Sequence, residues 1–118
     1  MSNLYINLAR QIISFGKTLD KTKDFETYKS MYRLCDLYQA TSYLYYKKDE
    51  SLISDETYDL LAKELLKRYN EIPNNYEIDK NSLKAGTGYA LKYSDIQIII
   101  FDFIYKIITY KPEKGALF

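Results

Sequence analysis

Apolar residues recur along the chain every three or four positions, and this pattern predicts four main α-helices. The first is predicted over residues 2–15, where apolar side chains share one face and Gly16 follows as a stop signal. A polar connector, residues 16–23, separates this helix from the next. The first apolar stripe consists of Leu4, Leu8, Ile12 and Phe15.

The second and third helices are predicted over residues 24–47 and 55–70, joined by the polar loop KKDESLI. Ser54 has the position of an N-cap, and Asp55 and Glu56 follow in the first turn, where the helix dipole favours acids. The apolar face of the second helix contains Phe25, Tyr28, Tyr32, Cys35 and Tyr38, widened by Leu34, Leu37 and Leu44. That of the third contains Tyr58, Leu61, Ala62, Leu65 and Tyr69.

Residues 70–88 carry helix breakers and turn formers and predict a long irregular segment. Within it, residues 84–88 lack phosphate-loop spacing and are interpreted as a flexible connector. A last helix is predicted over residues 95–110, because Ser94 and Gln97 have capping-box spacing. Its many β-branched residues make a strand the competing interpretation. The helix is favoured by the helical period of its polar positions, which are Asp95, Asp102, Lys106 and Thr109.

This last helix is apolar around most of its circumference, so we expect it to lie in the core or in a subunit contact. Pro112 and Gly115 are expected to end it. Ile99 and Ile108 are the positions predicted to meet a second copy in a homodimer. The positions predicted to face the domain's own core are Ile96, Ile100, Phe103 and Ile107.

The length of 118 residues fits one domain, so the sequence predicts a single all-α domain over residues 1–118. A net charge of +1, with few arginines among its cations, makes nucleic acid an unlikely partner. The single cysteine excludes an internal disulfide and favours a cytoplasmic protein, and we expect no secretory signal and no membrane span. The absence of histidine removes every catalytic or metal site that needs one.

Asp55, Tyr58 and Asp59 stand one helical turn apart and share a face of the third helix. Two carboxylates beside an aromatic ring suit a cationic, hydroxylated ligand, and Tyr45 and Tyr46 are placed to close over its other side. The same residues also fit a purely structural role, with a dipole-favoured acid, a core tyrosine and a solvated aspartate. No calcium-loop pattern is present, so we expect no metal site.

The stretch YLYYKKDESLISDETYDLLAKELLKRYNEIP resembles the N-terminal Ia domain of NAD-dependent bacterial DNA ligases. The resemblance has no gaps from Tyr43 to Tyr69, and a domain of this kind would extend over about residues 24–88. It also extends to the short ligase-related proteins of bacteriophages, which would place this protein in the host cytoplasm. The resemblance implies a helical fold that holds the nicotinamide mononucleotide half of NAD. The implied contacts are Tyr45, Asp55, Tyr58 and Asp59, with Tyr46 at a position where the ligases have histidine.

A ligase carries AMP on the lysine of a Lys-x-Asp-Gly motif in a separate domain, and this chain has no such motif. The sequence therefore predicts a non-catalytic protein without a required cofactor, which binds or sequesters NAD, nicotinamide mononucleotide or a related nucleotide. The alternative is a protein-interaction module that has lost nucleotide binding and acts on a phage or host protein as an inhibitor or adaptor. Cleavage of the NAD glycosidic bond by an acidic residue has no supporting motif.

Overall fold

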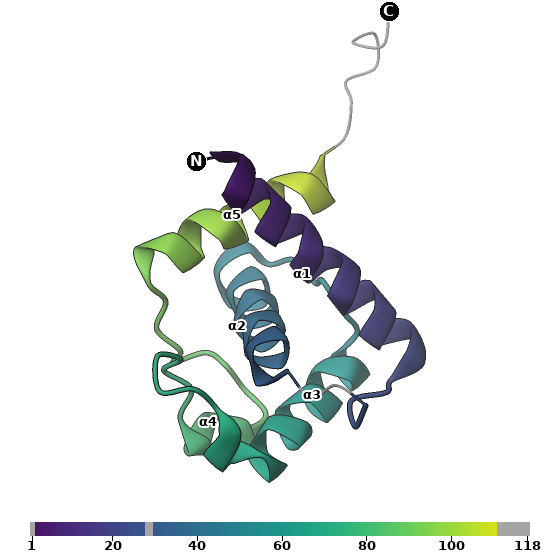
Figure 1. The fold of residues 1–118 in the computed structure, drawn as a ribbon, viewed down its shortest axis with the longest axis vertical. Helices are drawn as coiled ribbons and strands as arrows, with labels where there is room; N and C mark the ends of the chain where they lie inside the picture. Colours follow the sequence, from purple (N-terminus) through teal and green to yellow (C-terminus); the bar gives the residue numbers. More distant parts are fainter. Residues whose placement is uncertain (1, 28–29, 111–118) are drawn as a thin grey trace, which may run out of the picture.

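The central helix of the domain, α2 (Met31–Lys48), contacts α1 (Ser2–Thr22), α3 (Asp55–Lys67) and α5 (Asp95–Thr109) (Figure 1). A computed structural model describes residues 2–27 and 30–110. A 3₁₀ turn (Tyr69–Glu71) and the short helix α4 (Lys80–Ala85) follow α3, against which α4 packs. The described residues contain no strand, so the all-α prediction is confirmed. No helix among them is both long and apolar enough to cross a bilayer.

Two groups of buried side chains hold the helices together. One lies where α1, α2 and α3 meet and includes Leu19, Leu37 and Leu61, none of which is exposed to solvent. The other lies where α1 and α2 meet α5 and includes Leu44 and Ile104, which are equally buried. The long helix α1 and the central helix α2 contribute to both groups and so join the two ends of the domain.

The prediction that Gly16 ends the first helix is wrong, because α1 continues to Thr22. A β-carbon at Gly16 would lie 3.0 Å from Leu37 and 3.3 Å from Ile53, so the glycine lets α1 lie close to its neighbours. Leu19 extends the buried face beyond the predicted end, whereas Leu4 at the other end is 57% exposed.

The second helix begins at Met31 rather than at residue 24. Lys23 has a φ of 56°, which turns the chain out of α1, and Asp24 then accepts a hydrogen bond from the backbone N–H of Thr27 at 3.3 Å. Phe25 is buried as predicted although it is not helical. Tyr28 lies outside the described residues, and Tyr32 is largely exposed.

The start of α3 is as predicted, with Ser54 accepting a hydrogen bond from the backbone N–H of Thr57 at 3.2 Å. The helix ends at Lys67, three residues before the predicted end. The segment predicted to be irregular contains α4, which was missed because it is only six residues long. Asp79 caps its start, accepting from the backbone N–H of Ser82 at 2.9 Å.

The last helix has the predicted capping box, in which Gln97 N–H donates to Ser94 Oγ at 3.1 Å and Ser94 N–H donates to Gln97 Oε1 at 2.8 Å. Its buried face consists of Ile100, Phe101 and Ile104, so the prediction that Ile100 faces the core is confirmed while the rest of the predicted face differs.

Of the residues predicted to face the core, Ile96 is 53% exposed and Ile107 37% exposed, while Phe103 is half-buried. The difference arises because α1 and α2 cover only one side of α5, and periodicity cannot choose that side on a helix with apolar residues nearly all around it. Ile99 is 43% exposed and Ile108 is half-buried. Pro112 and Gly115 lie outside the described residues.

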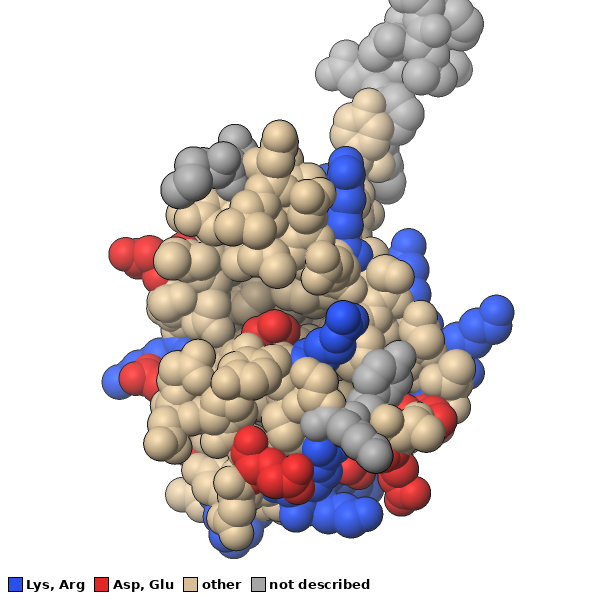
Figure 2. Space-filling view, in the orientation of Figure 1, with Lys and Arg blue, Asp and Glu red and all other residues tan. Residues whose placement is uncertain are grey.

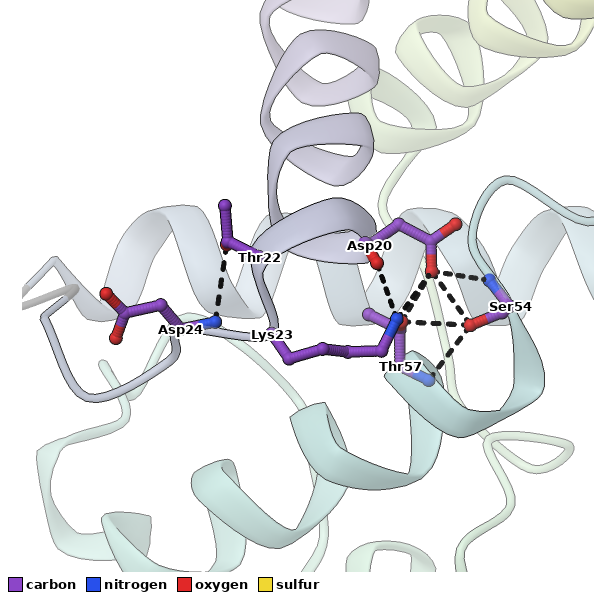
Figure 3. Close-up of polar contacts among 6 residues, drawn as sticks. All are labelled: Asp20, Thr22, Lys23, Asp24, Ser54 and Thr57. Atoms are coloured by element: carbon purple, nitrogen blue, oxygen red, sulfur yellow. Dashed lines mark hydrogen bonds and ion pairs between the residues drawn. The ribbon is translucent and has the colours of Figure 1, made fainter.

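The carboxylate of Asp20, near the end of α1, joins that helix to the start of α3 (Figure 3). It accepts hydrogen bonds from the hydroxyls of Thr57 at 2.5 Å and Ser54 at 2.8 Å, and from the backbone N–H of Ser54 at 3.2 Å. The Thr57 hydrogen bond contributes most to lowering the pKa of Asp20 from 3.8 to about 2. The charged carboxylate is therefore the form that stabilises this junction.

We expect Asp20→Asn to lower the free energy of unfolding by about 1–2 kcal/mol at neutral pH, because charge-assisted hydrogen bonds are lost from a partly exposed site. The folded-state pKa lies below the usual value, so the stabilisation is present above pH 3.8 and is lost as the pH falls through about 2. Urea denaturation from pH 7 to pH 2 measures this.

The matched control is Glu77→Gln, which removes the same charge at an exposed side chain. Equal stability losses in the two variants, or a loss for Asp20→Asn that does not shrink on acidification, would contradict the assigned role.

Candidate functional site

A cavity of about 270 Å³ lies between the C-terminal half of α2, the following loop and the first turns of α3. All five residues singled out from the sequence line it, together with five that were not. The described residues that line it are Thr41, Tyr45, Tyr46, Ser51, Leu52, Ile53, Asp55, Tyr58, Asp59 and Gly86. The structure therefore brings the predicted aromatic and acidic residues to one place.

Tyr58 is the most constrained side chain of this cavity. Its ring stacks on Tyr38, with the ring centres 5.3 Å apart and the planes 18° apart. Its hydroxyl forms a 2.7 Å hydrogen bond with Ser42 Oγ. Burial raises the pKa of Tyr58, so it remains a neutral phenol. With one face covered by Tyr38, the ring can offer only its other face to a ligand.

Tyr45 and Tyr46 form the aromatic wall on α2. Their rings meet edge to face, 4.9 Å between centres, and Tyr45 is 51% exposed. The ring of Tyr89 also packs edge to face with that of Tyr46, with 5.7 Å between the ring centres. The Tyr46 hydroxyl forms a 2.7 Å hydrogen bond with Thr87 Oγ1. Tyr46 is thus held in place by the chain, whereas Tyr45 presents aromatic surface to solvent.

Asp55 and Asp59 supply the charge of the cavity. They lie four residues apart on α3 and both are exposed. Within the described residues, neither forms an ion pair with a Lys or Arg side chain. Their oxygens are therefore available to a ligand that carries positive charge or hydroxyl groups.

Residues 86–88, interpreted from the sequence as part of a flexible connector, instead pack against the cavity. Gly86 adopts a φ of 69° and caps α4, and a β-carbon there would lie 3.8 Å from Asp59 Oδ1. Gly88 is buried so tightly that a β-carbon would overlap Ser42 and lie 2.8 Å from the Tyr58 hydroxyl. The two glycines were the available signal, since glycine permits close backbone approach.

The remaining lining residues, Thr41 and Ser51 to Ile53, had no distinguishing signal in the sequence. Thr41 is buried, and its hydroxyl donates to backbone carbonyls of its own helix, at 2.8 Å to Leu37 and 3.0 Å to Tyr38. Leu52 and Ile53 supply apolar surface. These residues add shape to the cavity rather than charge.

The described residues contain no cluster of three or more His, Cys, Asp or Glu side chains able to hold a metal ion. Cys35 is fully buried, and burial raises the pKa of its thiol to about 12, so it is a poor nucleophile. Figure 2 shows Lys and Arg interspersed with acidic and uncharged residues on the face in view, without a continuous basic surface.

A scan against protein-family models and searches of curated proteins and of solved structures find no match to this chain.

We expect Gly88→Ala to destabilise the protein by about 1–3 kcal/mol, because the added methyl group must displace Ser42 or Tyr58 in a packed site. The control is Ala90→Ser, an exposed change two residues further on. Thermal denaturation of both variants checks this. Equal melting temperatures would show that residues 86–88 do not seal the cavity.

Proposed function

We propose that this protein is a non-catalytic module that binds oxidised nicotinamide nucleotides, such as nicotinamide mononucleotide or NAD, and thereby captures or sequesters them. The single observation that supports this is the convergence of Tyr45, Tyr58, Asp55 and Asp59 on one cavity. Aromatic surface and carboxylates without cationic partners are what a flat, hydroxylated cation requires.

The chemistry of the ligand matches each wall of the cavity. Oxidised nicotinamide is a pyridinium cation, and an aromatic face attracts a cation by about 0.5–2 kcal/mol. Tyr45 and the open face of Tyr58 would take the ring. Asp55 and Asp59 would accept hydrogen bonds from the ribose hydroxyls and the carboxamide. Gly86, which has no side chain, leaves room beside Asp59.

The resemblance to the ligase Ia domain supports the same class of ligand, because the residues it implies as contacts all line this cavity. The non-catalytic part of the proposal rests on the missing Lys-x-Asp-Gly motif and on the lining itself. The described residues of that lining include no lysine that could carry AMP.

A larger cleft, about 650 Å³, lies along residues 69–79 and suits such a ligand less well. The ammonium of Lys80 already lies 5.4 Å from the centre of the Tyr69 ring, where a ligand cation would have to bind. The hydroxyl of the second tyrosine there, Tyr76, donates to Asp36 at 2.5 Å. The chain's own groups therefore already engage both tyrosines of this cleft.

An exposed apolar surface on α5 supports protein interaction as a second candidate function. Ile96, Ile99 and Ile107 are all exposed by more than a third, on a helix that is buried along another side. Such a surface suits contact with a second copy or another protein.

Calorimetric titration tests the nucleotide proposal. A ligand of about 22 non-hydrogen atoms at about 0.3 kcal/mol per atom gives a dissociation constant on the order of ten micromolar for nicotinamide mononucleotide. Tyr45→Ala should weaken binding by about 1–2 kcal/mol, and the reduced ligand, without the ring charge, should bind more weakly. Tyr32→Ala is the matched control, because Tyr32 is similarly exposed on the same helix but lies outside the cavity. No heat at millimolar ligand would refute the proposal.

Light scattering after size-exclusion chromatography tests the second candidate. If α5 meets a second copy, the protein should form a dimer at high micromolar concentration, and Ile99→Glu should return it to a monomer by placing a charge in an apolar contact. Thr18→Glu, an exposed change on α1, is the control. A monomer at every concentration would exclude self-association through this helix.

A further inference from the structure

We propose that the cavity selects the dephosphorylated cation, nicotinamide riboside, over the phosphorylated nucleotide. This deepens the proposed function and rests on it. In the resemblance to the ligases, Tyr46 stands at a position where they have histidine. Three observations on the cavity argue against a bound phosphate there.

The first is the charge of the lining. Among the described residues that line it, the ionisable carboxylates are those of Asp55 and Asp59, and none is Lys or Arg. Lys48, two positions beyond Tyr46, is directed elsewhere, because its ammonium lies 3.6 Å from Asp102 and 5.3 Å from the centre of the Tyr105 ring. A phosphate inside the cavity would meet like charge without a compensating cation, which costs affinity, whereas a pyridinium cation is attracted.

The second is the start of α3, where a helix would normally offer its amides to a phosphate. The carboxylate of Asp20 already occupies this position and holds Ser54 and Thr57 (Figure 3). Two further acids, Asp55 and Glu56, stand in the first turn. An anionic ligand at this end would have to replace or oppose three carboxylates.

The third is the state of the Tyr46 hydroxyl and the size of the space. That hydroxyl is already engaged with Thr87 at 2.7 Å, so recruiting it to a phosphate would break an existing hydrogen bond. The cavity measures about 270 Å³, near the lower limit of the roughly 300–1,000 Å³ of typical ligand pockets. That volume suits the nicotinamide and ribose, and leaves a phosphate or a second nucleotide outside.

Parallel calorimetric titrations with nicotinamide riboside and nicotinamide mononucleotide test this on the chain of residues 1–118. The riboside should bind about tenfold more tightly, since its net charge is positive and that of the mononucleotide is negative. Asp55→Asn and Asp59→Asn should each weaken riboside binding and bring the ratio of the two affinities closer to one. Both side chains are exposed, and thermal denaturation verifies that the variants fold. Glu77→Gln is the control, since it removes the same charge at an exposed side chain outside the cavity and away from the start of α3, and it should leave the ratio unchanged.

Each of the other outcomes would overturn the selectivity, the role of the two aspartates, or both proposals. Equal or tighter binding of the mononucleotide would show that its phosphate reaches cations outside the cavity, and would overturn the selectivity while leaving the proposed function standing. A riboside preference that survives in the Asp55→Asn/Asp59→Asn double variant would show that these carboxylates do not set it. Absence of binding by either ligand at millimolar concentration would overturn both proposals.

Discussion

The hydrogen bond between Tyr58 and Ser42, with the Tyr38 ring stacked behind Tyr58, fixes the spacing of α2 and α3 on which the cavity depends. Gly88 closes this junction from the side, because any side chain there would overlap both hydroxyls. A tyrosine held at its hydroxyl and at one ring face has little freedom left to lose on binding. This wall of the cavity is thus organised before a ligand binds. Because ordering side chains on binding lowers affinity, such a preformed wall favours binding.

A second anchor, Asp20, holds the opposite edge of the same helix. Together the two contacts orient the first turns of α3, so that Asp55 and Asp59 face the aromatic wall of α2 across the cavity. The structural carboxylate of Asp20 has hydroxyl and amide donors and the ammonium of Lys23 as partners, whereas the cavity carboxylates have no cationic partner among the described residues. In the proposed function, these acids beside exposed aromatic surface serve ligand binding.

Local sequence signals predicted the parts of the fold that depend on local chemistry. Ser54 and the Ser94–Gln97 pair were recognisable as helix starts because capping is a contact within three residues. The grouping of Asp55, Tyr58 and Asp59 followed from helical spacing alone.

The predictions that were wrong concern features that depend on tertiary packing. In the sequence, Gly16 has the properties of a helix end, but in the fold it allows α1 to lie close to Leu37. The buried side of α5 is determined by where α1 and α2 lie. The contribution of residues 86–88 likewise required the fold, because their partners are far away in the sequence.

Nuclear magnetic resonance of the tyrosine rings during titration with nicotinamide riboside tests the central claim most directly, because it both detects the ligand and locates it. Stacking of a pyridinium ring shifts the signals of the aromatic protons it covers. The cavity predicts saturable shifts for Tyr45, Tyr46 and Tyr58, with Tyr32 and Tyr76 unchanged. Shifts confined to Tyr69 and Tyr76 would place the ligand in the larger cleft, and the absence of any saturable shift at millimolar ligand would show that this cavity does not bind a nicotinamide cation.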